Sequence, residues 1–139
     1  MGMVYTEVTL KNVLDVGFAR SGFIKPEDVR AATVRAVADS GSMNLVITEE
    51  MRKELGLGIR EEKIAHIANG QRVACKMTDA VEIHWKNRYT ILQAMIIPGA
   101  QKILLGALAL EGLDLMINPV TQEVAGIHGD EVEYYALRA

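Results

Sequence analysis

The chain has 139 residues, of which 50% are hydrophobic, with a formal net charge of -3 and a pI near 5.6. This size suits one domain with a substantial core, so we expect residues 1–139 to form a single domain. Lysine and arginine are scattered, which argues against binding to nucleic acid or to anionic membranes. The longest apolar run, residues 103–110, is too short to cross a bilayer, and the N-terminus lacks the features of a secretory signal. We therefore expect a soluble, cytoplasmic protein.

The first part of the chain is predicted to form two strands separated by an irregular excursion. Hydrophobic and polar residues alternate over 3–11, and strand character returns at 31–38. Between these strands the pattern is loose, because glycines such as Gly17 interrupt it and Pro26 favours only a short helix. We interpret residues 12–30 as an excursion between strands.

Asp39 follows the second strand and precedes a third, buried strand at 45–47, so it lies on a loop between apolar strands. A carboxylate in this position needs hydrogen-bond donors to stay ionised, or a partner with which it shares a proton. Ser40 adds a hydroxyl, and Gly41 leaves space beside the backbone. An ordinary turn stabilised by the aspartate side chain is the alternative interpretation.

The middle of the chain predicts a short helix and a hairpin. Thr48 can cap a helix of about two turns that ends before Gly56. Asn69-Gly70 separates apolar runs at 59–68 and 72–78, a pattern typical of a hairpin in which both turn residues have positive φ.

The rest of the chain adds short strands and one more helix. A separate strand at 81–85 is predicted to turn at Lys86-Asn87 and to return as far as residue 97. A helix is expected at 107–111 with Gly112 as its cap, and strands are expected at 113–117 and 123–127. The tail, 129–139, has the composition of a strand that needs a partner. Together these elements predict an all-β domain with two or three short helices.

Four motifs in this order resemble those of the retropepsin-like aspartic proteases, most closely the small prokaryotic members. They are the segment 38–47 around Asp39-Ser40-Gly41, then Leu55-Gly56-Leu57, Ala68-Asn69-Gly70, and Leu104-Leu105-Gly106 followed by Asn118-Pro119. The resemblance covers roughly residues 30–127 and implies a retropepsin-like acid-protease barrel. Some positions depart from the family pattern: Ala38 is smaller than usual, Ser40 replaces the commoner Thr but keeps the hydroxyl, and Ala107 replaces an Arg or Asn of some retroviral relatives.

The resemblance implies an aspartic endopeptidase. In such enzymes one carboxylate deprotonates the attacking water, and a second carboxyl group donates a hydrogen bond to the carbonyl oxygen. The chain has a single Asp-Ser-Gly, so the resemblance implies a homodimer in which Asp39 of each copy forms the dyad. The alternative is a catalytically weak or inactive dimer of the same fold that acts as a peptide-binding or interaction module.

The resemblance also assigns supporting roles at this site. The residues expected to support the catalytic aspartates are Ser40, Gly41, Ser42, Leu104, Leu105 and Gly106, and Asn69 and Gly70 would form the tip of a flap that closes over an extended peptide. The tail, 129–139, would contribute to the dimer interface.

Neither a cofactor nor a metal ion is expected. The three histidines, His66, His84 and His128, are widely spaced and have no Cys or acidic residue at ligand spacing. Cys75, the only cysteine, excludes a disulfide within the chain and has no base beside it in the sequence that would make it a nucleophile.

Overall fold

The computed structural model of the chain describes residues 2–130, so most of the tail 129–139 lies outside the described residues. In order, the elements are β1 (Val4–Asn12), α1 (Val13–Arg20), the 3₁₀ helix η1 (Pro26–Asp28), β2 (Ala31–Ala38), β3 (Leu45–Ile47), α2 (Glu49–Leu55), β4 (Ile59–His66), β5 (Arg72–Trp85), β6 (Arg88–Ile96), β7 (Leu104–Leu105), α3 (Ala107–Gly112), β8 (Leu115–Asn118) and β9 (Glu123–Gly126). Strands dominate, which confirms the all-β prediction.

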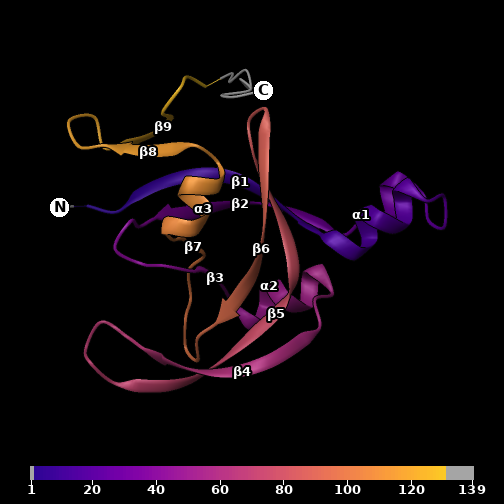
Figure 1. Ribbon diagram of the computed structural model, residues 1–139, viewed down its shortest axis with the longest axis horizontal. Helices are drawn as coiled ribbons and strands as arrows, with labels where there is room; N and C mark the ends of the chain where they lie inside the picture. The colour runs from indigo at the N-terminus through magenta and orange to yellow at the C-terminus, as the bar shows by residue number, and fades with distance from the viewer. Residues whose placement is uncertain (1, 131–139) are drawn as a thin grey trace, which may run out of the picture.

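The main sheet closes on itself. Its strand order is β1-β2-β7-β3-β6-β5-β4, and β1 also pairs with β5, so six strands form a closed ring. Figure 1 shows the β1–β2 pair running across the long β5–β6 pair. β4 pairs with β5 outside this ring and forms an edge of the sheet. The β2–β7 and β3–β6 pairs are parallel, and the other pairs are antiparallel. Closure leaves β4 as the strand with an unpaired edge in this sheet.

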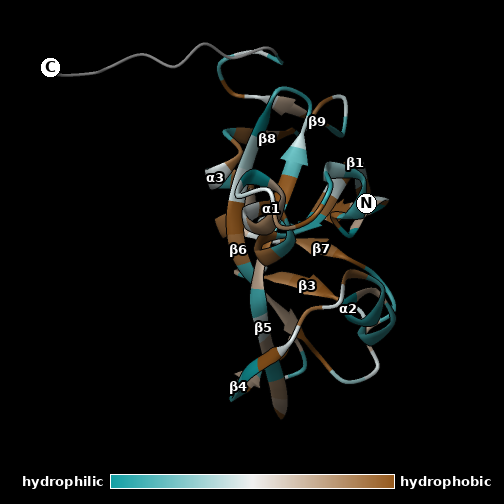
Figure 2. Cartoon of the chain, turned by 90° about the vertical axis from the view of Figure 1, so that its right-hand side faces the viewer, coloured by the Kyte–Doolittle hydropathy of each residue, from teal (hydrophilic) through white to brown (hydrophobic). Residues whose placement is uncertain are grey.

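The core fills the inside of the ring. Alternate residues of β5, namely Val81, Ile83 and Trp85, are buried together as the period-2 pattern predicts. They pack with Leu45 and Ile47 of β3, a strand whose three residues are all buried, and with apolar residues of the neighbouring strands. Figure 2 shows hydrophobic residues along β3, β6 and β7, near the middle of the molecule.

Helix α1 corrects the prediction that residues 12–30 form a loose excursion. Gly17 lies inside this helix instead of interrupting it. The side chain of Asn12 caps the helix by accepting a hydrogen bond from the Asp15 N–H at 3.1 Å. The Asp15 carboxylate in turn accepts hydrogen bonds from the backbone and the guanidinium of Arg30. The helix is thus stabilised by polar contacts between Asp15 and Arg30, fifteen positions away in the chain. A search for a periodic apolar pattern does not detect such contacts. Pro26 does begin the short helix η1, as predicted.

Two predicted boundaries in the second half are wrong. The strands expected at 72–78 and 81–85 form one strand, β5, which continues through a bulge between Met77 and Ala80. The buried Thr78 hydroxyl accepts the Ala94 N–H at this bulge, so the interrupted ladder keeps its hydrogen bonding. Gly112 is the last residue of α3 and not its cap, which is Leu113.

The turns follow the predicted chemistry more closely. Thr48 caps α2 through the Met51 N–H, and Gly56 ends the helix in the left-handed conformation with φ of 65°. At the first hairpin Gly70 has a positive φ of 83°, whereas Asn69 does not adopt a positive φ, so one of the two expected conformations is present. No helix in residues 2–130 is long and apolar enough to cross a membrane.

Candidate active site

Asp39 lies at the start of the loop that joins β2 to β3, and its side chain is exposed. The loop folds back so that the Ser42 N–H donates to the Asp39 carbonyl at 3.1 Å. The Gly41 N–H donates to Asp39 Oδ1 at 3.0 Å and thereby orients the carboxylate. Within residues 2–130 no donor reaches Oδ2, so this oxygen is free to contact a water molecule or a second carboxyl group. The local turn of the alternative interpretation is thus present, but it uses only one carboxylate oxygen.

Strand β7 supports the Asp39 loop through backbone pairing. It lies between β2 and β3, so Leu105 pairs with Ala38 on one side and with Leu45 on the other. The Asp39 N–H donates to the Leu105 carbonyl at 3.0 Å. Leu105 is completely buried, and Leu104 is partly buried. Both ends of the Asp39 loop therefore rest on the same two-residue strand.

Gly106 is required by the close approach of two backbone segments. A Cβ atom at this position would lie 2.5 Å from the Asn44 carbonyl oxygen and 2.6 Å from the Met43 carbonyl carbon. Directly after it, the Ala107 N–H donates to the Ser42 carbonyl at 2.7 Å. The first turn of α3 thus binds the second half of the Asp39 loop, and a larger residue at position 106 would separate them.

Two pockets adjoin Asp39. The first, of about 510 Å³, lies between the start of β1, the end of β2 and the turn after β8, and it is lined by Gly2, Met3, Val4, Val37, Ala38, Asp39, Ser40, Lys102, Leu104, Ile117, Asn118, Pro119 and Gln122. The second, of about 690 Å³, lies between the Asp39 loop and the end of β4, and it is lined by Asp39, Gly41, Ser42, Met43, Asn44, Val46, Lys63, Ile64, Ala65, His66, Ile67, Ala68, Met95, Ile97 and Leu104. Asp39 and Leu104 line both, so together the pockets form a cleft with Asp39 near its centre.

The β4–β5 hairpin borders the second pocket with residues 63–68, which precede the turn. The expected flap residues Asn69 and Gly70 are exposed at the tip and do not line the pocket. The structure thus brings Asp39, Ser40, Gly41, Ser42, Leu104 and Gly106 together at one place, with the hairpin beside them.

A family model described as aspartyl protease matches residues 26–109, which is more than half of the chain. The chain belongs to the aspartyl protease family. The match includes the Asp39 loop, the β4–β5 hairpin, β7 and the start of α3.

Solved structures with the same fold include the EIAV protease in complex with the inhibitor HBY-793. That structure has a TM-score of 0.56 and 17% identity, and the alignment covers 79% of this chain and 86% of the viral one. The retroviral protease-like domain of Ddi1 from Leishmania major has a TM-score of 0.51 and 15% identity, with 86% and 84% of the two chains covered. No curated protein matches the chain at a significant level. The fold of this aspartyl protease family member is therefore retropepsin-like.

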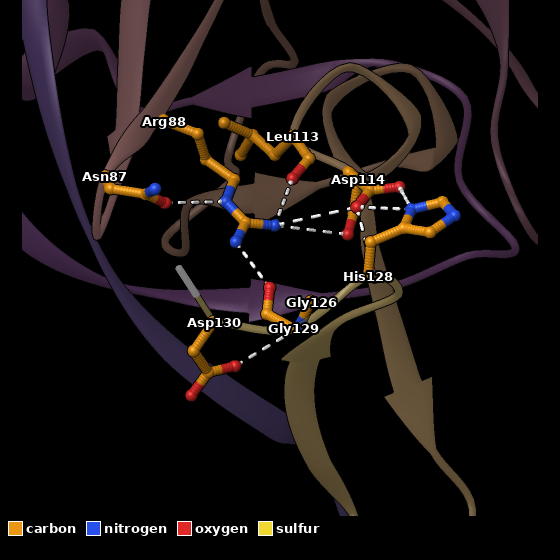
Figure 3. A network of polar contacts seen from close by, with 8 residues as sticks. All are labelled: Asn87, Arg88, Leu113, Asp114, Gly126, His128, Gly129 and Asp130. Atoms are coloured by element: carbon orange, nitrogen blue, oxygen red, sulfur yellow. Dashed lines mark hydrogen bonds and ion pairs between the residues drawn. The ribbon is translucent and has the colours of Figure 1, made fainter. Parts of the chain in front are cut away.

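A buried arginine, missed by the sequence analysis, organises the C-terminal end of the described chain (Figure 3). Arg88 is 2% exposed, and its guanidinium donates to the Leu113 carbonyl at 3.3 Å and to the Gly129 carbonyl. Asp114 lies 3.8 Å from the same guanidinium and accepts a hydrogen bond from His128, which lowers the pKa of the Asp114 carboxyl. None of these residues lines either pocket beside Asp39, so the network supports the fold of this family member at a distance from its cleft.

The histidines and the cysteine occupy separate places. His66 lines the second pocket, His84 contacts Glu82 at 2.5 Å, and His128 contacts Asp114. Within residues 2–130 no three His, Cys, Asp or Glu side chains are grouped as metal ligands would be. Cys75 is buried, and its burial raises the pKa of the thiol. A buried thiol with a raised pKa is a poor nucleophile.

Several lining residues were not anticipated from the sequence, namely Met3, Met43, Lys102 and Gln122. They come from four different segments of the chain. No local pattern marks Met3, Lys102 and Gln122, because each becomes part of the cleft only when the ring of strands closes, whereas Met43 lies within the motif segment 38–47.

Proposed function

We propose that this protein is an aspartic endopeptidase that hydrolyses extended peptides as a homodimer. The observation that carries the proposal is the position of Asp39, which is exposed at the centre of a cleft and keeps one carboxylate oxygen free of donors within residues 2–130. The aspartyl protease family and the retropepsin-like fold support it.

The homodimer follows from counting carboxyl groups in the cleft. Hydrolysis of a peptide bond by aspartates needs two carboxyl groups that share a proton. Asp39 is the only acidic residue among the described residues that line the two pockets. A second Asp39 from another copy supplies the missing group if the two clefts meet at a two-fold axis.

In this dyad the two aspartates divide the work. The ionised carboxylate removes a proton from a water molecule, whose oxygen attacks the peptide carbonyl carbon, while the protonated carboxyl group donates a hydrogen bond to the carbonyl oxygen. In the resulting tetrahedral intermediate, the carboxyl group that gained the proton from water transfers it to the nitrogen of the leaving amine, the C–N bond breaks, and the carboxylate is regenerated. The Gly41 N–H keeps the carboxylate oriented, and Leu105 and Gly106 keep the loop fixed during these steps.

The β4–β5 hairpin is proposed as the flap over the bound peptide. β4 forms an edge of the sheet, and residues 63–68 already border the cleft. Closure of this hairpin, with Asn69 and Gly70 at its tip, would exclude water and complete the walls of the cleft.

Mixed dimers test the shared site. We expect Asp39→Asn to abolish cleavage of a peptide library, because each active dimer needs two ionisable Asp39 side chains. When the wild-type protein is mixed with an equal amount of Asp39→Asn and allowed to exchange subunits, only about one quarter of the dimers retain both aspartates. Specific activity per wild-type chain should therefore fall by about half. Cleavage of a fluorogenic peptide measures the activity, and titration with a statine-type inhibitor measures the concentration of active dimers.

Four outcomes would overturn the proposal. Activity that persists in Asp39→Asn would exclude the dyad, and activity per wild-type chain that is unaffected by mixing would exclude a shared site. Sedimentation as a strict monomer under assay conditions would do the same. Peptide binding without turnover by the wild-type dimer would identify the protein as a peptide-binding module.

A further inference from the structure

We infer that Lys102 selects peptides that carry an acidic side chain close to the cleaved bond. This inference rests on the proposed peptidase function and concerns its substrate class. Lys102 lines the first pocket together with Asp39, on the segment that leads into β7. The rest of the pocket is mainly apolar, with Met3, Val37 and Ile117 among its lining residues.

The ammonium group of Lys102 is held in place but is not neutralised. Its Nζ lies 3.1 Å from the Tyr5 hydroxyl and 3.1 Å from the Met3 sulfur. It also lies 5.6 Å from the centre of the Tyr5 ring, whose face is covered by the guanidinium of Arg35 at 3.9 Å. Within residues 2–130 Lys102 forms no ion pair, so its charge has no acidic partner in the described chain.

The acidic residues closest to consider, Glu7 and Asp39, do not neutralise the charge of Lys102. Glu7 lies opposite Arg35 in the β1–β2 register and is aligned with that arginine, not with Lys102. Asp39 is the only acidic residue among the described residues that line this pocket, and the proposed mechanism uses it for catalysis. A carboxylate on the substrate is therefore the group that would pair with Lys102.

The parallel register locates this pairing along the substrate. Val37 pairs with Leu104, so Lys102 is two residues before this pair and Asp39 two residues after it. Four residues span at most about 13 Å when the chain is extended, and Lys102 lies in a bend before β7, so a lysine side chain covers roughly half of that distance or more. We therefore expect the acidic residue at the second or third position from the cleaved bond. In a homodimer the two copies of Lys102 extend the preference to both sides of that bond.

The test compares two internally quenched peptides that differ only in charge. Both have an apolar residue on each side of the central bond, and they carry either Glu or Gln at the second and third positions on both sides. The wild-type protein should cleave the Glu peptide with a kcat/KM about fivefold higher, because a partly exposed ion pair contributes modestly. This ratio should fall with added salt and should be close to one in Lys102→Met.

Lys11→Met is the matched control. Lys11 lies on β1 and pairs with Ala31, at the far end of β1 from Asp39. This variant should keep the wild-type preference for the Glu peptide. The inference is overturned if the wild-type protein cleaves the two peptides with equal kcat/KM. It is also overturned if Lys102→Met keeps the wild-type ratio of the two kcat/KM values.

Binding separates failure of the inference from failure of the proposed function. Fluorescein-labelled versions of the two peptides are titrated with Asp39→Asn and with the double variant Asp39→Asn/Lys102→Met, and anisotropy is measured. Tighter binding of the Glu peptide that disappears in the double variant supports the role of Lys102 even if the wild-type protein cleaves neither peptide. In that case only the peptidase function fails. Cleavage with no Glu preference in rate or binding means that only the inference fails.

Discussion

Two aspartates at opposite ends of the same β-ribbon have opposite environments. Asp39 follows the end of β2 where Ala38 pairs with Val4, and Asp15 lies in α1 beyond the end where Ala31 pairs with Lys11. Asp15 is buried and accepts three hydrogen bonds from Arg30, whereas Asp39 is exposed and accepts one from Gly41. A carboxylate whose oxygens are all bonded to the protein stabilises the fold, and one with a free oxygen can react.

The largest expected effect comes from removing the reactive carboxylate. Asp39→Asn should lower kcat by about a thousandfold or more, because the variant lacks the general base. Its free energy of unfolding should stay within about 0.5 kcal/mol of wild type, since the side chain is exposed and the Asn oxygen can still accept the Gly41 N–H. Peptide cleavage and urea unfolding measure the two quantities. A large loss of stability in this variant would contradict the comparison with Asp15.

The next largest effect concerns the support under Asp39. Gly106→Ala should destabilise the protein by about 2–4 kcal/mol and reduce cleavage, because the added methyl group collides with the backbone of Asn44 and Met43. Gly17→Ala is the matched control: apart from its chain neighbours and the backbone of its own helix, no atom of the described residues lies within 4 Å of the added Cβ. The residue is inside α1, so this change should stabilise by about 0.5–1 kcal/mol. Equal stabilities of the two variants in urea would mean that the close approach at Gly106 is not a constraint.

The smallest effect tests the structural carboxylate. Hydrogen bonding to the Arg30 side chain lowers the pKa of Asp15 from its ordinary value of 3.8. The stabilisation is therefore present at pH values above about 4 and is lost as the pH falls through the lowered pKa of the folded state. Asp15→Asn should cost about 1–3 kcal/mol at neutral pH, leave kcat unchanged, and reduce the loss of stability on acidification. Unfolding free energies measured between pH 2 and 7 would show parallel curves for the two proteins if Asp15 had no such role.

Much of the Asp39 site was determined by the local sequence. The loop between two apolar strands, the Thr48 cap, the left-handed Gly56 and the Gly70 turn follow from short-range rules that need no knowledge of distant residues. The motif order also predicted that Leu104, Leu105 and Gly106 lie beneath the loop, and the described hydrogen bonds have this arrangement.

Only the tertiary structure decided the other features. Helix α1 is stabilised by the contact between Asp15 and Arg30, and the cleft acquires Met3 and Lys102 only when distant strands come together in the ring. These residues carry no local signal, because hydrogen bonds and packing between distant segments form only when the chain has closed the ring. The sequence could predict the residues of the Asp39 loop, but the walls of the cleft come from long-range contacts that leave no periodic pattern.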